Sequence, residues 1–273
     1  MAGETTGSTV SLDAILKRDR LVVLTGIVGL AALAWIYMIH EARTMMHTGV
    51  CECMGMKMSA PDTAPWSTAQ LLPLFLMWAE MMVAMMLPSA APMILLFAVV
   101  NRRRREQEQP FVPTGVFLLG YLAVWTVFSA IAAVAQWGLH SAALLSSTMV
   151  ATSPLLGGGL LIAAGLFQWM PLKHACLRHC RSPLTFLMTD WRDGSWGAWM
   201  MGLKHGAYCT GCCWVLMALL FVAGVMNMWW IAAITILVLL EKALPHGVWI
   251  GRAAGACFVV WGAWLVTHGL SPH

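Results

Sequence analysis

Nineteen consecutive residues without a charge, Leu21-Val-Val-Leu-Thr-Gly-Ile-Val-Gly-Leu-Ala-Ala-Leu-Ala-Trp-Ile-Tyr-Met-Ile39, are the most informative part of this chain. An apolar helix of roughly 20 residues spans the hydrocarbon core of a bilayer. Six more apolar segments follow, at about 71–100, 113–138, 154–170, 199–223, 228–240 and 248–267. This pattern predicts an all-α, polytopic transmembrane helix bundle of about seven spans.

The composition agrees with that prediction. Of the 273 residues, 60% are hydrophobic and 10% are charged, whereas about a quarter of the residues in soluble domains are charged. This balance excludes a soluble enzyme, a disordered protein and a secreted disulfide scaffold. The 21 Met and 8 Cys residues supply many soft sulfur donors, which favour a soft metal ion. Nothing in the sequence indicates a nucleic-acid partner or a nucleotide-binding loop.

The basic residues predict the orientation. If the N-terminus is cytoplasmic, 14 of the 16 Lys and Arg residues lie on the inner side, and only Arg43 and Lys57 lie outside. Loop charge bias of this kind sets membrane topology. We therefore expect a multi-pass protein of the cytoplasmic (inner) membrane with its C-terminus outside. Its parts are a cytoplasmic segment (1–20), an anchor helix with an outer loop (21–69) and a membrane bundle (70–268).

The outer loop at 45–58 is rich in sulfur, with five Met, two Cys and one His in 14 residues. Thioether, thiolate and imidazole groups together suit Cu(I). Cys51 and Cys53 are therefore candidate ligands. The alternatives are an outer disulfide and a flexible loop that tolerates methionine.

The second apolar segment carries an ionisable residue, Glu80, about ten residues from its start. Such a group inside a span usually marks an ion path or a bound partner. Met77, Met81 and Met85 share one helix face that Glu80 borders, so Glu80, Met81 and Met85 are candidate metal ligands. The alternative is that these methionines only pack irregular helix interfaces. Pro88 also frees the carbonyl of Ala84 from the helix ladder.

The polar, basic stretch at 173–193 contains a third candidate site. If it is helical, Cys176, His179 and Cys180 share one face, and these groups could hold Cu(I) or zinc. The alternative is a reduced cytosolic loop whose basic residues lie against lipid headgroups. Further along, we expect Glu241 and Lys242 to form an ion pair at the inner end of the sixth span.

The fifth apolar segment carries the sharpest pattern. Soft donors recur at every fourth position of this segment, namely at Met201, His205, Cys209, Cys213 and Met217. Cys212 lies three residues after Cys209 and joins the same face. This stripe extends about 24 Å along a helix. His205, Cys209, Cys212 and Cys213 are the candidate ligands. The alternative is that small thiols pack an apolar helix interface.

Three motifs resemble a known family. They are Trp78-Ala-Glu80-Met81-Met82-x-Ala-Met85-Met86-x-Pro88, Pro171-Leu-Lys173-x-x-Cys176-x-x-x-Cys180-Arg181-x-Pro183 and Gly202-x-x-x-Gly206-x-x-Cys209-x-Gly211-Cys212-Cys213-Trp214. In this order they resemble an uncharacterised bacterial family described as predicted metal-binding integral membrane proteins. The resemblance covers about residues 70–268 and implies metal binding. The loop at 45–58 lies outside it.

The leading hypothesis is a copper-handling membrane protein that binds Cu(I) through Cys, Met and His ligands for transport, storage or delivery. Besides the lipid bilayer, its candidate partners are a copper chaperone and a larger membrane complex. The second hypothesis is an enzyme, a membrane thiol–disulfide oxidoreductase that uses Cys209 and Cys212. Since C-x-x-C pairs work best at an exposed helix N-terminus, an enzyme is not favoured. The third hypothesis is an accessory subunit of a larger membrane complex.

Overall fold

A computed structural model describes residues 6–48, 50–53, 56–59, 68–108, 111–146 and 149–269, and it describes the side chains of 21–44, 68–108, 111–146 and 149–269. The helices are α1 (Thr6–Thr48), α2 (Leu71–Glu106), α3 (Thr114–Ser141), α4 (Pro154–Phe167), α5 (Pro171–Arg181), α6 (Pro183–Asp190), α7 (Gly194–Ala218), α8 (Leu220–Ala223), α9 (Met228–Ala243) and α10 (Gly247–Gly269). A 3-10 helix η1 (Thr68–Gln70) precedes α2, and the strands β1 (Val50–Cys53) and β2 (Met56–Ser59) follow α1.

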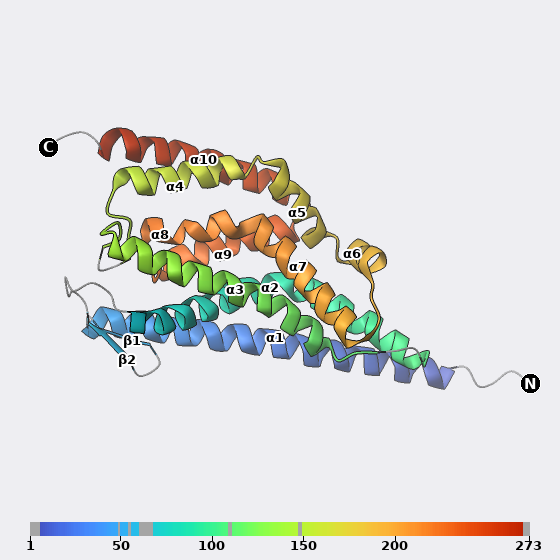
Figure 1. Cartoon of the computed structure of the whole chain (residues 1–273). Coiled ribbons are helices and arrows are strands. Elements are labelled where there is room, and N and C mark those ends of the chain that lie inside the picture. The colour runs from blue at the N-terminus through green and yellow to red at the C-terminus, as the bar shows by residue number, and fades with distance from the viewer. Residues whose placement is uncertain are drawn as a thin grey trace, which may run out of the picture.

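The long helices run roughly parallel to one another in a bundle, with α7 and α9 in the middle (Figure 1). Helix α1 packs on α2, α2 packs on α3, and α3 packs on α7. Helices α4 and α10 form a closely packed pair on the opposite side from α1 (Figure 1). Helix α1 begins at one end of the bundle and α10 finishes at the other (Figure 1).

Several of these helices have the length and apolar character of membrane spans. Within the described residues, five segments qualify individually: Leu21–Thr44, Thr68–Glu106, Thr114–Ser141, Gly194–Ala223 and Gly247–Gly269. Helices α4 and α5, bent by 63°, make a sixth if they are counted as one broken span. Helix α9 has 16 residues, which is shorter than a typical span. The all-α fold is therefore confirmed, whereas the count of seven spans stays a prediction.

A proline in α2 leaves one backbone carbonyl free to accept a hydrogen bond from α1. Because Pro88 has no N–H, the carbonyl of Ala84 is free of its helix partner, and it accepts a hydrogen bond from Trp35 Nε1 at 3.2 Å. This part-buried hydrogen bond joins α2 to α1 at Ala84. The Ala84 carbonyl thus has a structural partner.

Small residues allow the α4–α10 pair to pack backbone against backbone. A β-carbon added at Gly165 would lie 2.6 Å from the carbonyl oxygen of Gly255. One added at Gly262 would lie 2.6 Å from the carbonyl oxygen of Gly158. Helix pairs in membranes commonly use such small residues for close approach.

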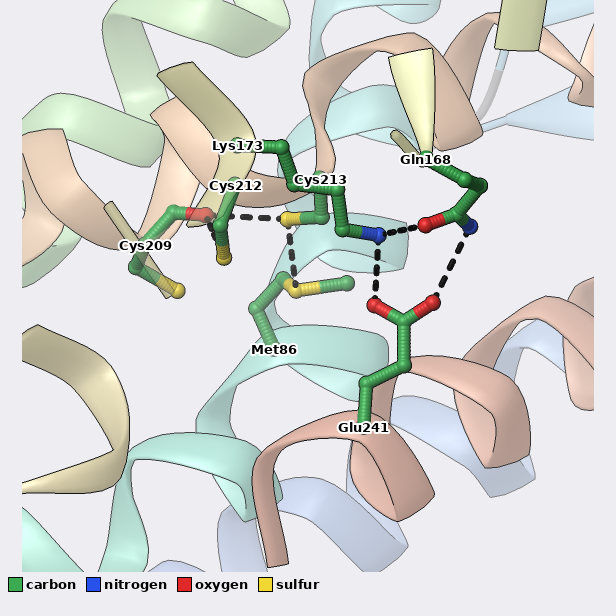
Figure 2. Close-up of polar contacts among 7 residues, drawn as sticks. All are labelled: Met86, Gln168, Lys173, Cys209, Cys212, Cys213 and Glu241. Carbon is green, nitrogen blue, oxygen red and sulfur yellow. Dashed lines mark hydrogen bonds and ion pairs between the residues drawn. The ribbon is translucent and has the colours of Figure 1, made fainter. Parts of the chain in front are cut away.

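The basic stretch at 173–193 contains the two short helices α5 and α6, each begun by a proline at its first turn. Lys173 is 1% exposed, and its ammonium group donates to Glu241 Oε2 at 2.6 Å. Gln168 Nε2 donates to the other carboxylate oxygen of Glu241 at 3.0 Å, and Lys173 also donates to Gln168 Oε1 (Figure 2). The predicted pair of Glu241 with Lys242 is therefore wrong, since neighbouring residues on a helix point about 100° apart.

The sulfur-rich segment after α1 contains an antiparallel hairpin, in which Cys51 pairs with Met58 and Cys53 with Met56. The side chains of Cys51 and Cys53 lie outside the described residues. Their predicted role as metal ligands therefore rests on sequence alone.

Candidate metal centre

The predicted stripe of soft donors on α7 faces the interior of the bundle. Each of its members is at most 2% exposed: Met201, His205, Cys209, Cys212, Cys213 and Met217. Close packing explains this burial, because α7 contacts α3 on one side and α5 on another. A glycine in α7, Gly206, lies against Val124 of α3, whose side chain would be 3.0 Å from an added β-carbon. The α7 stripe is thus in the core of the bundle.

Three of these residues bring thiols together over about one helical turn. The thiols of Cys212 and Cys213 each donate to the carbonyl oxygen of Cys209 at 3.0 Å (Figure 2). The Sγ of Cys213 also lies 3.9 Å from the Sδ of Met86, so a thioether of α2 joins the group (Figure 2). Met86 is fully buried. Two helices therefore contribute sulfur to one buried place.

Helix α5 adds a fourth thiol. Helix α5 packs against α7, and its Cys180 is partly buried against the same core as the α7 thiols. We call Cys180, Cys209, Cys212 and Cys213 the thiol cluster. Cys176, one turn earlier on α5, sits against Gly211, where an added β-carbon would lie 2.8 Å from its Sγ. The absence of a side chain at Gly211 therefore lets α5 bring its thiols to α7.

A positive charge and a phenol border the thiol cluster. Lys242 of α9 places its Nζ 3.0 Å from Cys209 Sγ and donates to Ser89 Oγ at 3.0 Å. Tyr121 of α3 has its hydroxyl 3.2 Å from Cys209 Sγ, and the same hydroxyl donates to the carbonyl oxygen of Met86 at 3.1 Å. Lys242 is thus the counter-charge that a thiolate in an apolar core requires.

His205 lies one turn before Cys209 on α7 and has a ring nitrogen without a hydrogen-bond partner. Its ring lies 5.7 Å from the ring of Tyr121 and 5.7 Å from that of Phe186, measured between centroids. Its Nδ1 is buried and has no hydrogen-bond partner. Since buried polar atoms are normally paired, this nitrogen is a candidate reserve ligand for a metal ion.

The other predicted ligands lie in different surroundings. His179 stacks on Tyr208 with 4.0 Å between ring centroids, and its Nδ1 lies 2.9 Å from the carbonyl oxygen of Ala175. Met81 and Met85 are fully buried on α2. Glu80 lines a separate cavity between α1 and α2. Of the α2 residues, it is Met86 that reaches the thiol cluster.

Among the described residues, no three His, Cys, Asp or Glu side chains form a group that could hold a metal ion as they stand. Those side-chain types include the cysteines of the thiol cluster but not thioethers. The contacts of Cys213 with Met86 and of Cys209 with Lys242 therefore define the donor set. Thiol and thioether sulfur is the chemistry that selects Cu(I) over hard cations.

Sequence reasoning missed Met86 and Lys242 as neighbours of the thiols. The signal for Met86 was present, because it lies in the second methionine pair of the α2 motif. For Lys242 no signal existed in the sequence, since its adjacency to Cys209 depends on how α9 crosses α7.

A buried group of thiols and a thioether, carried on apolar helices, is the donor chemistry of proteins that handle soft metal ions. The model of a family described as copper chaperone (PpoB2) matches residues 75–265. The chain therefore belongs to this copper chaperone family. The matched region extends from α2 into α10 and includes the thiol cluster and Lys242.

The family supports copper handling and association with copper, whereas the thiol–disulfide enzyme and the accessory subunit are not favoured by it. The matched family is described as a copper chaperone, whereas the sequence motifs resembled a family without an assigned activity. The resemblance to an uncharacterised family is therefore not confirmed. No curated protein and no solved structure matches the chain.

Proposed function

We propose that this protein is an integral membrane copper chaperone that binds Cu(I) at the thiol cluster and passes it on by ligand exchange. One observation carries the proposal. Sulfur atoms from α2 and α7 meet at one buried place beside the ammonium group of Lys242, and the Cys176 thiol of α5 lies against α7 at Gly211. Soft donors from separate helices are the arrangement that a buried Cu(I) ion needs.

The charge balance supports Cu(I) at this place. A Cu(I) ion bound by two thiolates carries a net charge of −1, and a net charge is costly to bury in an apolar core. Lys242, with its Nζ 3.0 Å from Cys209 Sγ, brings that net charge to zero. A divalent ion with the same two thiolates would leave one positive charge uncompensated beside Lys242.

Delivery fits the position of α5. Cys176 and Cys180 are partly exposed, whereas the three thiols of α7 are buried. A partner protein or ligand that reaches α5 would take Cu(I) from Cys180 first, and the α7 thiols would follow by stepwise exchange. The zinc site predicted at Cys176, His179 and Cys180 stays a secondary proposal, and elemental analysis of the same sample distinguishes the two metals.

The membrane topology is part of the proposal. The chain reverses direction along the bundle from α1 to α2, α3, α4, α7, α9 and α10, so that α1 begins at one end of the bundle and α10 finishes at the other (Figure 1). Seven crossings, with α9 as the short one, agree with this path. The positive-inside bias then places the N-terminus in the cytoplasm and the C-terminus outside. A reporter enzyme that is active on one side only, fused after residue 273, tests the orientation.

The decisive test is copper stoichiometry. Full-length protein is purified in detergent without oxygen and titrated with Cu(I) against a chelator of known affinity. We expect the double substitution Cys209→Ser/Cys213→Ser to abolish tight binding. The matched control is Cys257→Ser, because Cys257 is an exposed thiol on α10. Equal tight copper binding by the double variant and the control would refute the proposal, provided circular dichroism shows both to be folded.

A further inference from the structure

A second group of soft donors lies apart from the thiol cluster, around a cavity of about 310 Å³ between α1, α2 and the residues just before α9. Six of its lining residues carry metal-binding atoms: Met38, Glu41, Met77, Glu80, Met81 and Met226. The first two are on α1, the next three on α2, and the last precedes α9. We refer to these residues as the acidic methionine cavity.

The two carboxylates make this cavity unusual for an apolar bundle. Glu41 is 6% exposed and lines the same cavity as Glu80. The Oε1 atom of Glu80 is buried and has no hydrogen-bond partner. A buried carboxylate oxygen without a partner is costly in an apolar setting. A bound cation would remove that cost.

The four methionines indicate which cation. Thioethers are soft and neutral, so they favour Cu(I) over hard cations. Because they carry no charge, a Cu(I) ion bound only by thioethers keeps its charge of +1. Glu80, adjacent to Met81 in sequence and lining the same cavity, supplies the compensating anion. This donor set holds Cu(I) more weakly than thiolates do, which suits a site that must release its ion.

Helix α2 connects the acidic methionine cavity to the thiol cluster. From Glu80 to Met86 the helix rises about 9 Å. The methionines in between and at the end, Met81, Met82, Met85 and Met86, are each at most 1% exposed. Met86 then contacts Cys213, with 3.9 Å between the two sulfur atoms. Buried methionines of α2 therefore lie between the acidic methionine cavity and the thiol cluster.

We propose that the acidic methionine cavity is a second, weaker Cu(I) site that exchanges its ion with the thiol cluster through Met82 and Met86. The cavity's own binding stands on its residues alone, and only the destination of the ion rests on the proposed function. No electron transfer is needed, because copper stays Cu(I) and only its sulfur ligands are replaced.

The test uses the full chain, titrated without oxygen with Cu(I) against one weak and one strong competing chelator. Wild type is expected to bind one tight and one weak equivalent. Glu80→Gln combined with Met81→Leu should lose the weak equivalent and keep the tight one. Met93→Leu is the matched control, because Met93 is another buried methionine of α2 that does not line the cavity. If the double variant misfolds, the near-isosteric Glu80→Gln alone, with weaker binding expected, serves the same purpose.

The kinetics give a second, independent readout. Loading of the thiols, followed by the ultraviolet absorption of Cu(I)-thiolate, should slow about tenfold in Glu80→Gln at unchanged tight affinity, since only the compensating anion is lost. A weak equivalent that survives the cavity substitutions unchanged would overturn the inference, as would unaltered loading kinetics. If Cys209→Ser/Cys213→Ser binds only the weak equivalent, the cavity site is upheld. If wild type has the weak equivalent and no tight one, the cavity site is likewise upheld and the proposed function fails.

Discussion

The ammonium nitrogen of Lys242 lies 3.0 Å from the thiol sulfur of Cys209, which joins α9 to the stripe of soft donors on α7. A lysine so close to a buried thiol has two consequences. In the proposed function it would provide the charge that a Cu(I)–thiolate complex lacks, and it would repel a cation that arrives before the thiols have lost their protons. The same contact would then favour binding of Cu(I) as a dithiolate complex over binding by neutral thiols.

Replacing Lys242 therefore tests the charge balance. We expect Lys242→Met to weaken Cu(I) binding at the thiol cluster by about tenfold or more, because opposite charges a few Å apart interact strongly where the dielectric constant is low. Competitive Cu(I) titration measures the change. Lys204→Met is the control, since Lys204 makes a surface ion pair with Asp190 at some distance along α7. An unchanged affinity in Lys242→Met would contradict the proposed role of this lysine.

Replacing Gly211 tests the contact between α5 and α7. The added methyl group in Gly211→Ala would lie 2.8 Å from Cys176 Sγ, so this thiol must turn away from α7 or α5 must move. We expect a loss of about 1–3 kcal/mol in stability, which is typical of overpacking, together with weaker copper binding. Thermal unfolding and copper titration measure the two effects.

The control for Gly211→Ala is Gly138→Ala on α3, where an added β-carbon has no neighbour within 4 Å. There alanine should be neutral or should stabilise the helix by up to about 1 kcal/mol. If both alanine variants behaved alike, the close approach of Cys176 to Gly211 would not matter for the site.

The buried ion pair between Lys173 and Glu241 predicts strong coupling. Either single substitution, Lys173→Met or Glu241→Met, leaves a charge without its partner in the core and should cost about 3–5 kcal/mol. The double substitution should cost less than the sum of the two, because no lone charge remains. Unfolding of the four proteins in detergent gives the coupling energy. The exposed pair Arg102–Glu106 is the reference, with an expected coupling of about 0.5 kcal/mol or less.

Bound copper should stabilise the fold. A ligand present at about 100 times its dissociation constant adds about 2.7 kcal/mol to stability when it binds only the folded state. We therefore expect Cu(I) to raise the unfolding temperature of wild type and of Cys257→Ser. Cys209→Ser/Cys213→Ser should show no such increase under the strong chelator, which keeps weaker sites empty. A copper-dependent increase of equal size in that variant would show that the ion is bound elsewhere.

Much of the architecture could be predicted from the order of residues alone. Uncharged runs such as 21–39 predict helices long enough to cross a bilayer, because a backbone without water must satisfy its own hydrogen bonds. The four-residue repeat from Met201 to Met217 predicts one helix face, and the structure buries that face. Both are properties of single helices. Periodicity within one segment is therefore sufficient to find them.

The pairing of helices belongs to the tertiary structure. Glu241 pairs with Lys173, 68 residues earlier, and not with its neighbour Lys242. Helix α5 packs its cysteines against α7, and the α2 sulfur that meets the α7 thiols belongs to Met86 rather than to Met81 or Met85. Helical periodicity states which side chains share a face but not which face of another helix lies opposite. That choice depends on crossing geometry and on close approaches such as Gly211 against Cys176, which exist only once the helices have packed.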